Sequence, residues 1–145
     1  MDFPLGGNGG NMNKVGIVTG AFDIIHPGYV RLLKDAKSVC DYLIVALHED
    51  PSIERPLTKA KPIFSVEERA EILMSFRCVD EVRTYKTEND LVILLLEIHP
   101  DIRIVGSDYS GISITGKNII PLYYHQRNHN WSVTLIRKMI REEMQ

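Results

Sequence analysis

The chain has 145 residues, of which 44% are hydrophobic and 25% are charged, and its net charge is −2. This is the length of one domain and the composition of an ordinary globular protein, which excludes disordered and fibrous classes. The slight excess of negative charge disfavours a protein that coats nucleic acid. The longest purely apolar run, residues 91–96, is far shorter than the roughly 20 residues that span a bilayer. We therefore expect a cytoplasmic protein with no nucleic-acid or membrane partner.

The order of the segments predicts the fold class. Residues 1–13 are rich in glycine and asparagine, so we expect a flexible leader there and one domain over residues 14–145. The expected strands are 15–19, 42–47, 81–85, 102–105 and 119–124, and the expected helices are 27–39, 65–76, 88–98 and one that begins after Ser132. This alternation predicts a single Rossmann-like α/β domain, with a five-stranded parallel sheet and helices on both faces.

Polar segments follow three of the expected strands. They cover residues 19–29, 106–109 and 125–134. In open parallel sheets, ligands bind beyond the carboxyl ends of the strands, where the strand order reverses. The sequence therefore predicts that these three segments form one ligand site.

The segment 19–29 has the features of a phosphate site. Gly20 allows a tight turn off the strand. Pro27 suits the first turn of a helix, and Gly28 leaves backbone N–H groups uncovered. A helix N-terminus with His26 beside it can bind phosphate. Taken alone, a histidine at position 26 fits better with a simple helix cap or with a side chain that fills a surface notch.

Four segments in order resemble the HxGH nucleotidyltransferase superfamily, in its cytidylyltransferase-like branch. The first, Gly20-Ala-Phe-Asp-Ile-Ile-His-Pro-Gly-Tyr29, is similar to the branch's Gly-x-Phe-Asp-x-x-His-x-Gly-His. The second segment combines Lys59-Ala-Lys61 with Glu67-Glu-Arg69, and it is similar to a lysine-containing loop and helix start of the branch. The third segment, Gly106-Ser-Asp-Tyr109, is similar to the branch's segment after the fourth strand. Arg127-Asn-His-Asn-Trp-Ser-Val-Thr134 resembles Arg-Thr-Glu-Gly-Ile-Ser-Thr-Thr. The branch includes glycerol-3-phosphate cytidylyltransferases and heptose-phosphate adenylyltransferases.

The resemblance implies an enzyme that transfers a nucleotidyl group from CTP or ATP to a small phosphorylated alcohol or sugar and releases pyrophosphate. We expect CTP in preference to ATP. The resemblance also implies Mg²⁺ carried with the triphosphate, no metal ligands from the protein, and a homodimer, which is common in the family.

The resemblance assigns roles to individual residues. The expected catalytic residues are His26, Lys61 and Arg127. The expected nucleotide-binding residues are Ala21, Phe22, His26, Gly28, Tyr29, Lys61, Gly106, Asp108, Arg127, Ser132 and Thr134. The expected acceptor-binding residues are Asp23, Lys59 and Arg69. Simpler roles compete with these: the lysines fit solvated loop charges, Arg69 fits an ion pair with neighbouring glutamates, and Asp108 fits a helix cap.

The chain departs from the family pattern at Tyr29, which stands where the branch has its second histidine. A phenol donates a neutral hydrogen bond, worth about 0.5–1.5 kcal/mol, whereas a charge-assisted bond is worth about 1.5–3 kcal/mol. The difference corresponds to a loss of about ten- to a hundredfold in rate. Ala21 and Val133 also depart from the pattern, and the helix at 88–98 lacks an early lysine found in glycerol-phosphate relatives. The alternative hypothesis is a nucleotide-binding module of the same fold that has lost catalysis.

Overall fold

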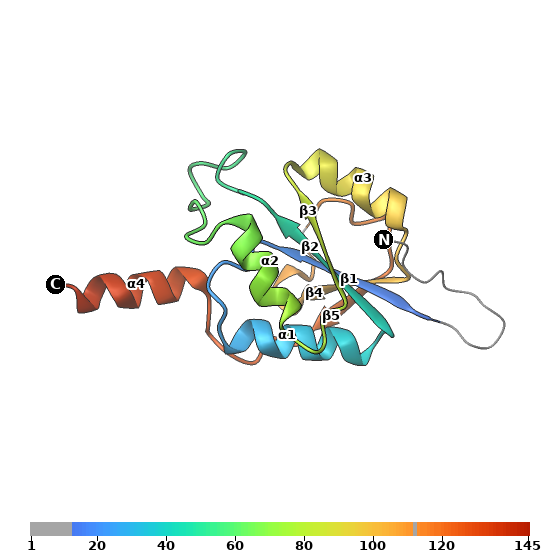
Figure 1. Cartoon of the computed structure of the whole chain (residues 1–145), viewed down its shortest axis with the longest axis horizontal. Helices are drawn as coiled ribbons and strands as arrows, with labels where there is room; N and C mark the ends of the chain where they lie inside the picture. Colours follow the sequence, from blue (N-terminus) through green and yellow to red (C-terminus); the bar gives the residue numbers. More distant parts are fainter. Residues whose placement is uncertain (1–12, 112) are drawn as a thin grey trace.

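The computed structural model describes residues 13–111 and 113–145, so the expected leader lies outside the described residues except for residue 13. The elements in chain order are β1 (Val15–Gly20), α1 (Pro27–Ser38), β2 (Tyr42–His48), α2 (Val66–Met74), β3 (Glu81–Tyr85), α3 (Glu88–Ile98), β4 (Ile102–Gly106), the short 3₁₀ helix η1 (Ser107–Tyr109), β5 (Leu122–His125) and α4 (Val133–Glu143). The strands form one all-parallel sheet in the order β3-β2-β1-β4-β5. The predicted Rossmann-like α/β class is confirmed (Figure 1).

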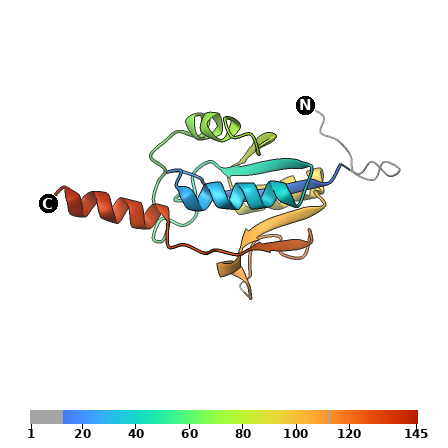
Figure 2. The same cartoon turned by 90° about the horizontal axis from the view of Figure 1, so that it is seen from below.

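Two apolar clusters cover the two faces of this sheet. α1 and α2 pack on one face and α3 packs on the other (Figure 2). The first cluster includes Val18, Leu33, Ala36, Val45 and Leu73. The second includes Ile17, Ile44, Leu91 and Leu95. Alternate residues of β1 and β2 point to opposite faces, because side chains alternate along a strand. β2 and β3 lie on one side of β1, and β4 and β5 lie on the other, so the order in which strands are added reverses at β1. The switch point therefore lies between β1 and β4.

Local capping signals set the starts of the helices. Ser65 accepts a hydrogen bond from the Glu68 amide, and the Glu68 carboxylate accepts one from the Ser65 amide. The capping box expected from the sequence is therefore present and begins α2. Thr87 and Asp90 form a second box at the start of α3.

The fifth strand begins later than the sequence predicts, at Leu122 instead of residue 119. Gly116 accepts a turn hydrogen bond from the Ile119 amide, and Ile120 is buried in the cluster on the α3 face. Pro121 has no N–H, so it contributes only its carbonyl, which accepts from the Arg103 amide at 2.8 Å. The apolar pair before the proline therefore packs in the core without pairing as a strand.

The last helix, α4, projects away from the sheet (Figures 1 and 2). Ser132 caps it, as the sequence predicts, by accepting from the Leu135 amide at 3.0 Å. None of its residues is buried, and Met139 and Ile140 are each 49% exposed. None of the helices in the described ranges combines the length and apolar character needed to cross a bilayer.

Candidate active site

A cavity of about 720 Å³ opens at the carboxyl ends of the strands, beside the switch point. The three polar segments expected to form one site all contribute to its wall. Of the residues with expected roles, those that line it are Ala21, Phe22, Asp23, His26, Gly28, Tyr29, Lys59, Gly106, Asp108, Arg127, Ser132 and Thr134. The expected site residues outside the lining are Lys61 and Arg69.

His26 forms the N-cap of α1 and faces this cavity. Its Nδ1 accepts a hydrogen bond from the Gly28 amide at 3.0 Å, and the residue is only 8% exposed. A neutral ring that accepts at Nδ1 carries its proton on Nε2. Burial lowers the pKa of His26, and nearby His129 and Arg127 lower it further. The cap role is therefore observed, and Nε2 remains as an N–H donor for a ligand.

Tyr29, at the motif position that departs from the family, lies against His26. The two rings stack with centroids 4.1 Å apart, and Phe22 contacts Tyr29 from another side at 4.9 Å. Burial raises the pKa of Tyr29 to about 12, with a further contribution from Asp23. The phenol is therefore neutral and supports the imidazole ring by stacking.

Gly28 lies under two imidazoles. A Cβ added there would meet Cε1 of His129 at 2.3 Å and Cε1 of His26 at 2.8 Å. Real Cβ atoms do not approach other atoms that closely, so this placement of the two imidazole rings requires a glycine at position 28. The glycine lets the loop before α4 close over the start of α1.

Arg127 is fixed at the wall of the cavity by three contacts. Its Nη1 pairs with Asp108 at 3.2 Å, its Nη2 donates to the Trp131 carbonyl at 2.6 Å, and its amide donates to Ser107. The side chains of Arg127 and Asp108 are 33% and 47% exposed. An ion pair this open is weak, so a polyanion can compete with Asp108 for the guanidinium. Asp108 makes no capping hydrogen bond in η1.

The first turn of α4 completes this wall. Ser132 and Thr134 line the cavity, and Ser132 already accepts from Leu135. The unpaired amides of a helix start attract anions. This part of the wall therefore suits phosphate groups.

Two residues expected to bind the acceptor act as braces in this structure. Asp23 is 4% exposed and accepts from the amides of Ile63 and Phe64 at 2.9 and 3.1 Å. Arg69 is 1% exposed. Its guanidinium donates to the carbonyls of four residues, which are Ala21, His48, Glu49 and Phe64. Four of the five N–H groups of the Arg69 guanidinium therefore donate to backbone carbonyls, and no ion pair between Arg69 and a glutamate is found among the described residues. The acceptor contact of Arg69 stays a prediction.

The two loop lysines differ in placement. Lys59 lines the cavity, whereas Lys61 lies outside its lining and its carbonyl accepts from Arg137 at 3.0 Å. The expected contact between Lys61 and a bound triphosphate stays a prediction.

His125, at the end of β5, also lines the cavity. Its Nδ1 binds Asp35 of α1 at 2.7 Å, and Tyr123 donates to the same carboxylate at 3.1 Å. His129, in the loop that follows, lies over the start of α1 and edge-on to His26.

Sequence reasoning missed a polar group on the α3 side of the cavity. Arg103 is 3% exposed and donates to the Thr115 carbonyl and to Thr19 at 3.2 Å. Its Nε is buried without a hydrogen-bond partner among the described residues. Tyr85 and His48, which stack at 4.6 Å, line the same side. An arginine inside an otherwise apolar central strand was the signal that could have revealed this group.

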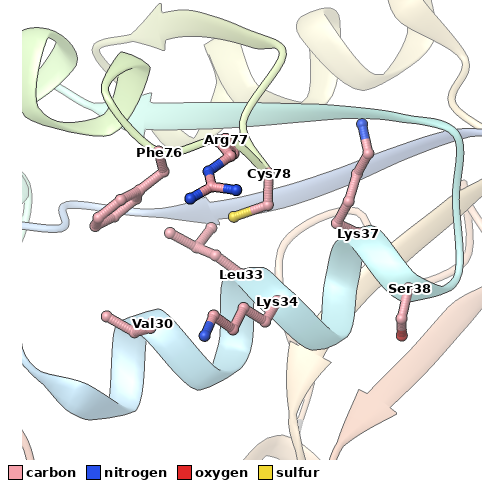
Figure 3. Close-up of a pocket in the computed structure, with 8 residues that line it drawn as sticks. All are labelled: Val30, Leu33, Lys34, Lys37, Ser38, Phe76, Arg77 and Cys78. Carbon is pink, nitrogen blue, oxygen red and sulfur yellow. The ribbon is translucent and has the colours of Figure 1, made fainter.

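A second cavity of about 630 Å³ lies between α1 and the turn that follows α2 (Figure 3). Val30, Leu33 and Phe76 give it an apolar side. Lys37, at its rim, pairs with Asp80 and donates to the Asp41 carbonyl. This cavity is remote from the carboxyl ends of the strands.

Two carboxylates that line the main cavity already form ion pairs with arginines. Asp23 and Asp108 are held by Arg137 and Arg127 respectively. In the part of the chain that the structure describes, no three histidine, cysteine or acidic residues are grouped as a metal site. Binding of Mg²⁺ together with a triphosphate stays a prediction.

The fold and the cavity define an α/β protein with a ligand-sized cavity at the switch point of a parallel sheet. Residues 17–139 match the family model described as cytidylyltransferase-like, and the chain belongs to that family. It is 37% identical over 107 residues to the bifunctional protein HldE of Gluconacetobacter diazotrophicus, and 36% identical over 107 residues to that of Hyphomonas neptunium. Each alignment covers 74% of this chain and 22% of the relative. The chain thus spans about a fifth of the length of these relatives.

Two solved structures share the fold. A lipopolysaccharide core biosynthesis protein from Thermoplasma volcanium superposes with a TM-score of 0.63 at 24% identity, over 80% of this chain and 98% of that one. A structure described as a putative nicotinate-nucleotide adenylyltransferase from Vibrio parahaemolyticus gives 0.58 at 14% identity, over 91% of this chain and 89% of that one. At these identities the likeness concerns the fold.

Proposed function

We propose that this protein transfers a nucleotidyl group from a magnesium–nucleoside triphosphate to a small phosphorylated sugar or alcohol and releases pyrophosphate. One observation carries the proposal. His26, Arg127 and the start of α4 line a single cavity at the switch point of the sheet. This places N–H donors from three elements around a space that suits a polyphosphate.

In the proposed reaction, an oxygen of the acceptor phosphate attacks the α-phosphorus of the triphosphate. A bond forms between that oxygen and phosphorus as the bond from phosphorus to the α–β bridging oxygen breaks. The bridging oxygen leaves with its electron pair as part of pyrophosphate. The protein positions two polyanions and offsets the charge that develops, so it needs no nucleophilic side chain.

The roles follow the positions of the side chains. The Nε2–H of His26 donates to the α-phosphate, where charge builds in the transition state. Arg127 and the first amides of α4 hold the β- and γ-phosphates. Lys59, which lines the cavity, and Lys61 bridge the nucleotide and acceptor phosphates in this proposal.

The acceptor is proposed to occupy the α3 side of the cavity. Arg103 and Thr19 meet there at 3.2 Å, and His48 and Tyr85 line the same chamber. A buried guanidinium with an unpaired Nε suits the hydroxyl or anionic oxygens of an acceptor. The chamber therefore favours a polyhydroxylated or acidic acceptor over an apolar one.

The choice of nucleotide is part of the proposal. The sequence favours CTP over ATP, but the relatives give that preference no support, because homologues of the HldE type favour adenylyl transfer. We therefore propose ATP with a sugar phosphate as the first pair to assay and CTP as the second. The homodimer and the cytoplasmic location remain predictions.

The competing hypothesis, a binding module without catalysis, draws its support from Tyr29 and Ala21. Turnover separates the two hypotheses. We expect wild-type protein to release pyrophosphate with at least one acceptor, and His26→Ala and Arg127→Ala each to lower the rate at least about a hundredfold. Full activity in either variant would contradict the assigned role, whereas tight triphosphate binding with no turnover would favour the module.

A further inference from the structure

We propose that His129, in the loop before α4, supplies a second imidazole to the phosphate site and acts there as a catalytic residue together with His26. This inference rests on the proposed function. It places the second imidazole of the site on a residue far in sequence from the segment 20–29. In the family pattern quoted above, a glutamate stands at the position of His129.

The placement of His129 carries the inference. Its ring meets that of His26 edge-on, with centroids 6.3 Å apart. Its Nε2 would lie 2.6 Å from a Cβ on Gly28, which means that it sits directly over the first turn of α1. Both histidines line the main cavity. Two imidazoles from opposite walls therefore meet at the helix start where a phosphate is expected.

The hydrogen bonding of His129 fixes its ring. Its Nδ1 accepts from the Trp131 amide at 3.0 Å, so the neutral ring carries its proton on Nε2. His26 is fixed in the same way through the Gly28 amide. Both rings are thus held in the same tautomer, each with an N–H to donate. Donors held in place before the reaction stabilise a developing charge at little cost in reorganisation.

Tyr29 does not fill this role. Its ring stacks on His26, and burial raises its pKa to about 12, so it is a neutral side chain that supports the ring of His26. Gly28 permits the close approach of His129, since any side chain there would collide with the imidazole. In this chain, therefore, the second imidazole of the site comes from the loop before α4, whereas α1 carries Tyr29 at the family's second histidine position.

A four-protein cycle tests the inference: wild type, His129→Ala, Tyr29→His and the double variant. Pyrophosphate release gives kcat and KM, and calorimetry gives the Kd of the magnesium–triphosphate. We expect His129→Ala to lower kcat at least about tenfold with a smaller change in nucleotide KM. In the Tyr29→His background, where α1 carries its own second imidazole, we expect the same change to cost less than about threefold.

Asn130→Ala, an exposed neighbour in the same loop, is the matched control and should leave kcat unchanged. Thermal unfolding of all variants checks that each is folded. Unchanged kcat in His129→Ala, or an equal loss in both backgrounds, would overturn the inference and leave the proposed function standing.

If wild type binds the triphosphate but turns over no acceptor, the proposed function fails, and the catalytic part of the inference fails with it. The four proteins are then compared by their Kd for the magnesium–triphosphate. A loss of affinity of at least about fivefold on His129→Ala, confined to the Tyr29 background, supports His129 as the second phosphate-binding imidazole, and an equal loss in both backgrounds contradicts it. Absence of triphosphate binding at millimolar concentration contradicts both proposals.

Discussion

Arg137 of α4 donates a hydrogen bond to the Oδ2 of Asp23 at 3.0 Å, which ties the last helix to the first motif. Asp23 is 4% exposed, and its carboxylate also holds the end of the loop 49–64. We predict that Asp23→Asn lowers the free energy of unfolding by about 2–4 kcal/mol, because the partly exposed guanidinium of Arg137 and two amides lose a charged acceptor that is itself buried. Urea denaturation followed by circular dichroism measures this change.

The exposed pair Lys138–Glu142, at 3.9 Å on the same helix, provides the control. Glu142→Gln should change the free energy of unfolding by less than about 0.5 kcal/mol. Equal stability of Asp23→Asn and wild type would show that Asp23 is not a brace, and would return it to the acceptor role expected from the sequence.

Tyr29→Phe is predicted to keep turnover within about threefold of wild type. Phenylalanine preserves the stacking on His26 and the contact with Phe22, and the neutral phenol contributes no charge. Steady-state kinetics measure the effect. A loss above tenfold would mean that the hydroxyl group of Tyr29 touches a substrate.

The histidine pair predicts a pH dependence. The pKa of His26 and that of His129 are both lowered from 6.5, in each case mainly by burial. The unfolded chain therefore binds protons more readily, so this contribution to stability is complete above pH 6.5 and is lost as the pH falls through the folded-state pKa values. We predict that the melting temperature falls between pH 7 and 5.

A bound polyphosphate should reverse this shift, because negative charge raises the pKa of an adjacent imidazole. Other charged or titratable groups near the pair are Arg31, Asp108, His125 and Arg127. Calorimetric titration at pH 6 in two buffers of different ionisation enthalpy should detect proton uptake on binding. Uptake that persists unchanged in a His26→Gln/His129→Gln variant would assign the protons to other groups.

Arg103→Met is predicted to raise the acceptor KM at least about tenfold and to change the nucleotide Kd by less than threefold. The guanidinium lies on the α3 side of the cavity and makes no ion pair in the described ranges, so a methionine of similar volume should be tolerated. Arg77→Met, at the separate cavity beside α1, is the matched control. An unchanged acceptor KM would place the acceptor elsewhere.

Most of the fold could be predicted from the sequence, because strand and helix patterns alternate cleanly from residue 14 onward. The exceptions have local causes. Pro121 delays β5, since a residue without an N–H cannot continue the pairing of Ile119 and Ile120. The apolar residues of α4 predict an amphipathic helix. Whether such a helix packs on its own sheet depends on the direction in which the preceding loop orients the helix, and the sequence does not show that direction.

The site was predicted in outline because motifs that follow parallel strands must meet at one edge of the sheet. Which side chains face the cavity was less accessible. Arg69 lies in a segment that resembles the family, but its guanidinium donates to four backbone carbonyls, and only three-dimensional packing shows this. Arg103 was overlooked because strand periodicity assigns a residue to a face without stating what covers that face.

The central claim is nucleotidyl transfer, and pyrophosphate release tests it most directly. Purified protein would be incubated with magnesium and either ATP or CTP, alone and with a panel of phosphorylated sugars and alcohols. We predict release that depends on both the triphosphate and one acceptor class, and that falls at least about a hundredfold in His26→Ala. No acceptor-dependent release with either nucleotide across the panel would contradict the account.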